Sequence, residues 1–428
     1  MITEMLLLYA GYSTYNYLKN LDLYHFKYEF NEIMKGLGIK NKLEQTFKIK
    51  RIYKTSYGYK SQIQIPNGLS LSKLESNIEI LQDNLNGIIT LDKDKFSPYI
   101  DFRIVLKDID KFIYSPVKTK PNELYIGKLF TTKDYIIDLN KEPMLLIAGS
   151  TGTGKSMLLS TILTNLIYNS SKYIDIHLLQ SMKSELSSFD ECNCIASANY
   201  TLSNCSNKLK QLNSTLKKRS ELFKQNGIRN IDQWNKYHKK EYMKRIIIVI
   251  EEISFFMEDE TIWDLVASIC KAGRSVGIHI ISCVQRTTAQ SLNTTVKSQM
   301  SKITFIQKST IDSINVINTT DAVKLKEREC IFDGNTEYVQ VKTPYIDDDF
   351  TILHKYVPEI KTPTKSQVYK DNKNEVHNNN ISIDEENNTV QYMETYNIID
   401  IEEKDIKQLP KPNHKRNKGK IKESDFKW

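Results

Sequence analysis

The chain has 428 residues, a length that allows two or three domains. Apolar residues make up 40% of it, which is enough for a buried core and excludes a wholly disordered protein. Its 60 Lys and Arg against 52 Asp and Glu give a formal net charge of +8, too mild by itself to identify a nucleic-acid binder. The apolar run Met5–Ala10 is far shorter than the roughly 20 residues of a membrane helix, so we expect a soluble, cytoplasmic protein.

Residues 1–140 alternate short strand patterns with helical ones. Lys60–Ile65 alternates polar and apolar residues, and Leu71–Leu85 repeats apolar residues at helical spacing. A second strand is predicted over Ile100–Leu106. This region is therefore predicted to be a small α+β accessory domain.

Residues 141–360 have a different pattern, in which continuous apolar strands alternate with longer helical stretches. The predicted strands are Met144–Ala148, Ile174–Leu179, Ile246–Ile250, Ile278–Cys283 and Ile303–Ile306. Such strands are typical of a mostly parallel sheet that helices cover on both faces. The predicted fold class is α/β.

Residues 361–428 have few apolar residues and are predicted to form a disordered, charged tail. Asp384–Asp405 carries eight acids and one base, and Lys407–Lys427 carries eight bases and two acids. Such a segment buries too little apolar surface to offset the entropy of ordering it. Its basic end could contact DNA or a recruiting protein, although a solvated tail without specific contacts is the simpler interpretation.

A phosphate-binding motif follows the strand Met144–Ala148 directly and precedes a helical stretch. Its residues are Gly149, Ser150, Thr151, Gly152, Thr153, Gly154, Lys155 and Ser156, which fit the pattern G-x-x-x-x-G-K-[ST]. The glycines allow backbone N–H groups to surround a phosphate, and the helix N-terminus adds a favourable dipole. We expect Lys155 to reach the β- and γ-phosphates of ATP and the Ser156 hydroxyl to bind Mg²⁺.

Two further segments complete the predicted catalytic site. Glu251 and Glu252 end an apolar strand, where Glu251 could hold Mg²⁺ and Glu252 could polarise the attacking water. A helix over Ile262–Lys271 is predicted to end at Gly273, which puts Arg274 in a loop at the rim of the sheet. Arg274 could reach a neighbouring subunit's γ-phosphate, or be a solvated loop charge, and Gln285 after the next strand could sense the phosphate.

These residues resemble the FtsK/SpoIIIE family of DNA-translocating ATPases over roughly residues 120–345. The matching segments, in the family's order, are Pro143–Ser156 (PMLLIAGSTGTGKS), Lys217–Asn230 (KKRSELFKQNGIRN), Arg274–His279 with Val284-Gln285-Arg286, Lys308–Ser313 (KSTIDS) and Cys330–Val341 (CIFDGNTEYVQV). The resemblance implies a RecA-like P-loop motor that assembles as a homo-oligomeric ring, usually a hexamer, around double-stranded DNA. It makes Arg274 the candidate arginine finger acting on a neighbouring subunit, and Gln285 the γ-phosphate sensor.

The sequence also departs from the family. Glu251 stands where the family usually has Asp, and only Lys183 is kept from its D-P-K segment. We find neither a strong membrane segment nor a winged-helix DNA reader.

The leading hypothesis is a double-stranded DNA translocase of a plasmid or conjugative element, with Thr287–Lys302 as a candidate DNA-contacting segment. The alternative is a slowly hydrolysing, nucleotide-dependent DNA-binding or partition scaffold; a small-molecule P-loop enzyme or GTPase lacks support, since no N-K-x-D motif is present.

Overall fold

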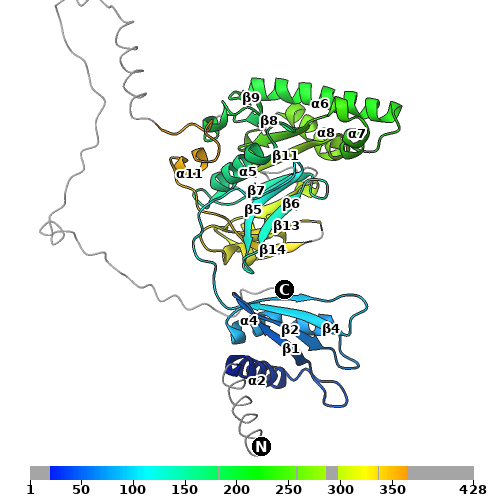
Figure 1. The fold of residues 1–428 in the computed structure, drawn as a ribbon, viewed down its shortest axis with the longest axis vertical. Helices are drawn as coiled ribbons and strands as arrows, with labels where there is room; N and C mark the ends of the chain where they lie inside the picture. Colours follow the sequence, from blue (N-terminus) through cyan, green and yellow to red (C-terminus); the bar gives the residue numbers. More distant parts are fainter. Residues whose placement is uncertain (1–19, 182–183, 257–258, 286–296, 336, 364–428) are drawn as a thin grey trace, which may run out of the picture. The chain divides into compact units, whose positions relative to one another are not determined.

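Figure 1 shows the fold, taken from a computed structural model that describes residues 20–363 except 182–183, 257–258, 286–296 and 336. The described helices are α2 (Leu21–Gly36), α3 (Leu71–Glu75), α4 (Ile78–Leu85), α5 (Lys155–Ser170), α6 (Leu202–Gln225), α7 (Ile231–Tyr237), α8 (Glu260–Val276), α10 (Thr310–Ile317) and α11 (Thr351–His354). The strands are β1 (Lys48–Lys54), β2 (Gly58–Gln64), β3 (Ile88–Asp92), β4 (Tyr99–Val105), β5 (Glu123–Leu129), β6 (Asp134–Asp138), β7 (Met144–Ala148), β8 (Ile174–Leu179), β9 (Ile195–Asn199), β10 (Arg245–Ile250), β11 (Ile278–Val284), β12 (Ser301–Thr304), β13 (Glu329–Asp333) and β14 (Tyr338–Lys342). Within the described residues, no helix is both long and apolar enough to span a membrane.

The first sheet is antiparallel and has four strands in the order β1-β2-β4-β3. One of its faces packs Ile63 and Phe102 against Phe30 of α2 and Leu81 of α4. The strands predicted near residues 60–65 and 100–106 are present as β2 and β4. The predicted helix over 71–85 is interrupted at Ser76 and Asn77, where the Asn77 side chain donates a hydrogen bond back to the carbonyl oxygen of Lys73, and α4 begins after Asn77.

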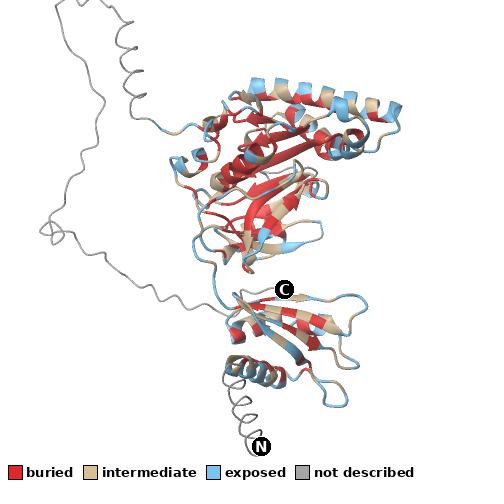
Figure 2. Ribbon diagram, in the orientation of Figure 1, coloured by how far each residue is buried: buried red, intermediate tan, exposed pale blue. Residues whose placement is uncertain are grey.

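The second sheet has ten strands in the order β6-β5-β14-β13-β12-β7-β11-β10-β8-β9. Strands β12, β7, β11, β10, β8 and β9 run parallel, whereas β13, β14, β5 and β6 form an antiparallel extension. Every residue of β7, β10 and β11 is buried, which Figure 2 shows as the red centre of this sheet. The predicted α/β fold with a mostly parallel sheet is confirmed.

Helices cover both faces of the parallel strands, and alternate residues of each strand face opposite layers. Leu145 and Ile147 pack with α5, while Met144 and Leu146 pack with α6 and α8. This arrangement explains the continuous apolar runs, since a strand buried on both faces has no solvent-facing position. It also brings the C-terminal ends of β7, β8, β10 and β11 to the same edge of the sheet.

The ten-stranded sheet begins before residue 141. Strands β5 and β6 join it through β14, with Leu129 opposite Val341, so the boundary expected at residue 140 falls inside the structural unit. The pairing joins segments more than 200 residues apart, which local patterns do not reveal. The chain from α11 onward also contributes Val357 and Ile360 to the core of this unit, while residues 364–428 lie outside the described residues.

Candidate nucleotide-binding site

The predicted phosphate-binding residues form a tight loop between β7 and α5. Gly152 and Gly154 have φ angles of 76° and 110°, in the left-handed region that L side chains rarely adopt. A Cβ added at Gly149 would lie 2.8 Å from Phe305 Cβ and from Thr153 Oγ1. The glycines are therefore needed both for the curl of the loop and for its packing against the strand end.

Lys155 places its ammonium group inside this loop. Its side chain is 7% exposed, and Nζ donates hydrogen bonds to the carbonyl oxygens of Gly149 at 2.5 Å and Ser150 at 2.8 Å. The first turn of α5 has no acidic residue. A buried cation at a positive helix end favours an anionic ligand, so the residues present fit the phosphates of a nucleotide.

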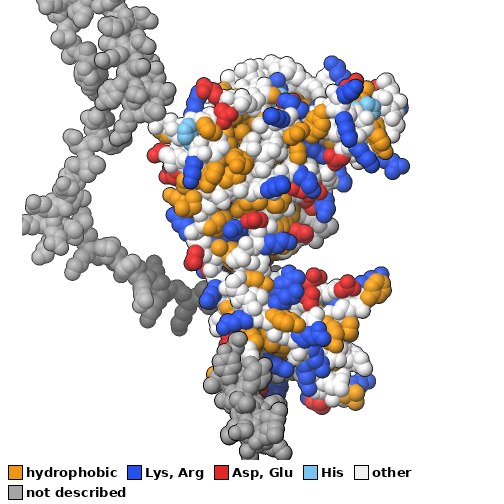
Figure 3. All heavy atoms as spheres, viewed as in Figure 1, with side chains coloured by type: hydrophobic (Ala, Val, Ile, Leu, Met, Phe, Trp, Pro, Cys, Tyr) orange, Lys and Arg blue, Asp and Glu red, His pale blue; other side chains and the backbone are white. Residues whose placement is uncertain are grey.

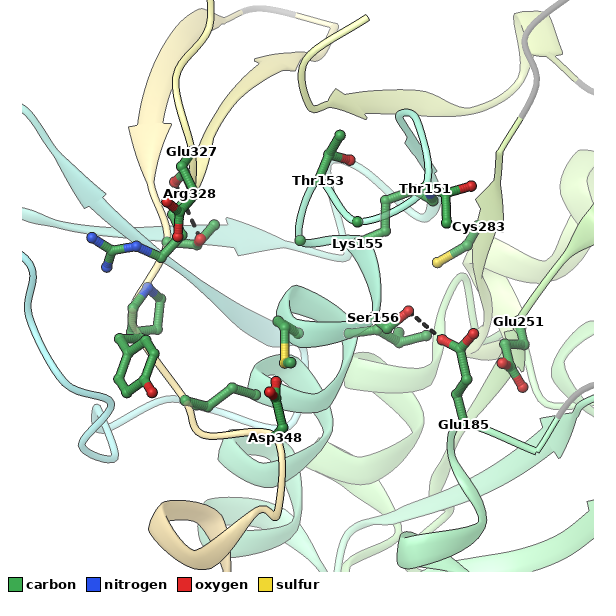
Figure 4. A pocket seen from close by; sticks show the side chains of 18 of the residues that line it. Thr151, Thr153, Lys155, Ser156, Glu185, Glu251, Cys283, Glu327, Arg328 and Asp348 are labelled. Carbon is green, nitrogen blue, oxygen red and sulfur yellow. Dashed lines mark hydrogen bonds between the residues drawn. The ribbon is translucent and has the colours of Figure 1, made fainter. Parts of the chain in front are cut away.

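A cavity of about 500 Å³ adjoins the loop (Figure 4). This volume lies within the usual range for small-molecule sites. Its lining combines the loop Thr151–Met157 with Glu185, Glu251 and Gln285, and with residues from the segments around β13 and β14. Figure 4 shows Glu185 and Glu251 on the side of Ser156 and Arg328 on the far side.

The two consecutive glutamates at the end of β10 have different surroundings. Both are buried, at 4% exposed for Glu251 and 5% for Glu252. Glu251 lines the cavity, whereas the Glu252 carboxylate accepts hydrogen bonds from Ser254 Oγ at 2.6 Å and from the backbone N–H of Gln285 at 3.1 Å. Gln285 follows β11 and lines the cavity itself, so this hydrogen bond links Glu252 to the cavity wall.

Glu185 is a site residue that the sequence analysis missed. Its carboxylate accepts a hydrogen bond from the Ser156 hydroxyl, as the dashed line in Figure 4 shows. The backbone N–H of Leu186 donates to the Gln180 side chain at 3.0 Å, which holds the segment against the end of β8. A signal was available: Glu185 lies soon after β8, which pairs in parallel with β10, so both strands end at the nucleotide edge.

The oxygen groups of Ser156, Glu185 and Glu251 line one side of the cavity. Hydroxyl and carboxylate oxygens are the ligands that Mg²⁺ prefers, directly or through water. These residues therefore fit a magnesium ion bound together with the phosphates.

The sequence analysis also missed the residues that line the cavity on the side away from Ser156. Arg328 has a left-handed backbone with φ 62°, and its Nε and Nη1 are buried without a hydrogen-bond partner among the described residues. Its carbonyl oxygen accepts from the backbone N–H of Thr343 at 2.8 Å. Tyr345 and Asp348 extend this wall. No local motif marks these residues, because only the pairing of β13 with β14 places them at the cavity.

The predicted loop around Arg274 is helical, which corrects the sequence analysis. Helix α8 continues to Val276, and Gly277, with φ 71°, ends it. Gly273 serves close packing instead, since a Cβ there would lie 2.4 Å from the carbonyl oxygen of Ile278. Arg274 is exposed in the last turn of α8, which leads into the N-terminal end of β11, the sheet edge opposite the phosphate loop.

The predicted DNA-contacting segment Thr287–Lys302 is placed only in part. Residues 287–296 lie outside the described residues, as does Lys183. Lys302 belongs to β12 and lies 4.0 Å from the Asp333 carboxylate, so it is a strand residue in an ion pair and not a loop cation. Its position follows from the pairing of β12 with β13.

The sequence is similar to that of a known protein family. Residues 115–263 match the model of the FtsK/SpoIIIE family. The chain is 28% identical over 232 residues to the DNA translocase FtsK of Caldanaerobacter subterraneus subsp. tengcongensis, covering 52% of this chain and 33% of that protein. It is 26% identical over 294 residues to the DNA translocase SftA of Bacillus subtilis, covering 65% and 30%. The chain thus spans about a third of the length of these relatives.

Among solved structures, the conjugation coupling protein TcpA of pCW3, in a monomer form with ATPγS, has a similar fold. The TM-score is 0.54 at 22% sequence identity, and the match covers 78% of this chain and 99% of that one. At this identity the likeness establishes the fold alone.

Proposed function

We propose that this chain, an ATPase of the FtsK/SpoIIIE family, uses ATP hydrolysis to move double-stranded DNA. The observation that carries the proposal is the single cavity shared by the phosphate loop, Glu251 and Gln285. A motor needs such an arrangement because the state of the γ-phosphate must be read by residues on neighbouring strands.

The nucleotide would be held mainly by the phosphate loop. Lys155 would exchange its contacts with the carbonyl oxygens of Gly149 and Ser150 for the β- and γ-phosphates. Ser156 and Glu251 would hold Mg²⁺, which when bound neutralises charge on the phosphate oxygens. Glu185 supports the Ser156 hydroxyl by accepting its hydrogen bond.

Hydrolysis requires a group that orients and deprotonates water. We assign this role to Glu252, whose carboxylate is held by Ser254 and by the backbone of Gln285. Gln285 lines the cavity and can therefore respond to the γ-phosphate. Loss of that phosphate would change the Gln285 position and, through the shared hydrogen bond, the Glu252 carboxylate.

Arg274 is proposed to act on a neighbouring subunit. It is exposed at the sheet edge opposite its own phosphate loop, so its guanidinium is available to a second copy of the chain. This arrangement suits a ring of subunits, and we propose that six copies of the chain form such a ring around DNA. An arginine supplied across the interface stabilises charge that develops on the transferred phosphoryl group.

We propose that the protein acts in the transfer or segregation of a plasmid or conjugative element. The similar fold of a conjugation coupling protein is consistent with that assignment. The cytoplasmic location and recruitment through residues 364–428 remain predictions.

The competing hypothesis is a slowly hydrolysing DNA-binding scaffold. It is motivated by Glu251, whose side chain is one methylene longer than the family's Asp and could slow turnover.

The deciding experiment is the steady-state ATPase rate with and without long linear double-stranded DNA, at low and high salt. A motor that contacts backbone phosphates should be strongly stimulated, and the stimulation should fall as salt rises. A slow rate that DNA does not change would favour the scaffold.

A further inference from the structure

Within the residues that the structure describes, one face of the four-stranded N-terminal sheet is not covered by a helix. The register pairs Tyr53 with Lys60 and Lys60 with Arg103, so these three side chains form a row across β1, β2 and β4 on that face. A second pair, Arg51 and Gln62, lies on the same face. The opposite face carries the apolar residues that pack against α2, α3 and α4.

The uncovered face is basic on the side of β1 and β2. On β1 and β2, this face carries Lys48, Arg51 and Lys60 and no acidic residue. Lys48, Arg51 and Lys60 are exposed and form no salt bridge with any residue that the structure describes. Figure 3 shows Lys and Arg side chains gathered on the visible side of the part formed by residues 20–106.

Acidic residues on this face lie toward its other edge. Asp101 is opposite Gln62, and Asp92 of the edge strand β3 is opposite Asp101. The positive charge is therefore concentrated over β1 and β2 rather than neutralised across the sheet. Lys48 and Gln64 also line a hollow of about 340 Å³ at the β1 side, which adds amide donors to the basic surface.

Protection of a sheet edge does not account for this pattern. Lysines on the edge strand β1 would discourage pairing with another strand. Lys60 and Arg103, however, lie on β2 and β4, which are interior strands and have no free edge to protect. An interior row of cations beside an exposed tyrosine instead favours a ligand that is negatively charged over a long surface.

We propose that this face, defined by Lys48, Arg51, Lys60 and Arg103, binds the phosphate backbone of double-stranded DNA. Cations and amides that contact phosphates supply affinity without reading the base sequence. The inference rests on the proposed function, because it takes double-stranded DNA as the ligand.

The test uses the full-length protein and a labelled DNA duplex, with the dissociation constant measured by fluorescence anisotropy at several salt concentrations. The variant Lys48→Gln/Arg51→Gln/Lys60→Gln removes three exposed cations from the face. Its matched control, Lys27→Gln/Lys35→Gln/Lys73→Gln, removes three exposed cations from α2 and α3 of the same domain. The rate of ATP hydrolysis without DNA, which should not change, verifies that each variant is folded.

The expected result is that the affinity for the DNA duplex depends less on salt concentration in the face variant, and is unchanged in its salt dependence in the control variant. Each lost phosphate contact should reduce the slope of log K against log salt by about 0.9, or roughly 2 to 3 in total for three contacts. The single variant Lys60→Gln should lower the slope by about one unit.

An unchanged slope and affinity in the face variant, when the wild type binds DNA, would overturn this inference alone. In that case a second copy of the chain or the acidic segment 384–405 would be the better occupant. A wild-type protein that neither binds the duplex nor responds to it in ATP hydrolysis would instead overturn the proposed function, and this inference with it.

Discussion

The Ser156 hydroxyl donates a hydrogen bond to the Glu185 carboxylate, which connects the first turn of α5 to the segment after β8 (Figure 4). Ser156 is the proposed magnesium ligand, so Glu185 is placed to orient that ligand or to accept a hydrogen bond from metal-bound water. Groups that support metal ligands in this way commonly contribute about 10- to 100-fold to metal affinity.

Replacing Glu185 with Gln should therefore weaken the effect of magnesium on nucleotide binding. We expect the ratio of ADP affinities with and without Mg²⁺ to fall by about tenfold or more, measured with a fluorescent ADP analogue. Asp348→Asn is the matched control, because Asp348 lines the same cavity but comes from the segment after β14. An E185Q protein with the wild-type ratio would show that the hydrogen bond is structural only.

Replacing Glu252 with Gln should stop hydrolysis without preventing nucleotide binding. The amide oxygen of Gln can still accept from the backbone of Gln285, but it cannot take a proton from water. General-base catalysis contributes about 10²- to 10⁴-fold, so a loss in that range is expected in single-turnover measurements. Glu260→Gln, a surface change in the first turn of α8, should leave the rate unaltered. Comparable turnover in both variants would remove Glu252 from the assigned role.

Replacing Arg274 with Ala should lower hydrolysis and leave nucleotide binding intact, because its side chain lies away from its own phosphate loop. Mixing this variant with the Lys155→Ala protein should restore part of the activity. In the mixture, an intact Arg274 can face an intact phosphate loop on a neighbouring copy. If the mixed proteins assemble but stay inactive, the site is not shared between subunits.

His279 should make the stability of the protein sensitive to acid. It is fully buried between Arg245 and the carbonyl oxygen of Pro143, with Nε2 3.0 Å from Arg245 Nη1. Burial, together with the positive charge of Arg245, lowers the pKa of His279 from 6.5 to about 3. Between these two values the unfolded chain binds a proton that the folded chain does not, so stability falls as the pH falls.

The size of this effect can be measured by urea denaturation. Lowering the pH from about 7 to about 5.5 should cost the wild type about 1.3 kcal/mol through His279. The His279→Gln protein should lose less than the wild type over the same interval, whatever its stability at neutral pH. His25→Gln, on an exposed face of α2, should behave as the wild type does. Equal acid sensitivity in all three proteins would argue against a neutral, buried His279.

Removing residues 364–428 should leave the ATPase unit folded. A longer deletion that begins at Thr351 would also remove Leu353, Val357 and Ile360, which are at most 3% exposed. Burial of three such side chains stabilises a fold by roughly 5 kcal/mol or more. Thermal unfolding and DNA-free ATPase rates should therefore be preserved by the first deletion and lost with the second. Loss of folding in the shorter deletion would refute the predicted tail.

Several elements could be predicted because the determining residues are close in sequence. The apolar runs in β7, β10 and β11 predict buried parallel strands, and the glycines before Lys155 predict a phosphate loop. Gly273 was misread because glycine can either end a helix or allow close packing. Only the 2.4 Å approach of the Ile278 carbonyl oxygen to an added Cβ distinguishes these two roles.

The sequence by itself predicted a nucleotide-binding loop in this protein, since the phosphate loop is a contiguous segment whose backbone conformation depends on its own glycines. It also identified the strands, because burial on both faces leaves a local signature. The tertiary structure alone decided that Glu185 meets Ser156 and that Arg328 lines the same cavity. It likewise decided that β5 and β6 extend the ten-stranded sheet. These relationships depend on which distant strands pair, and pairing is set by the packing of the whole core rather than by any short segment.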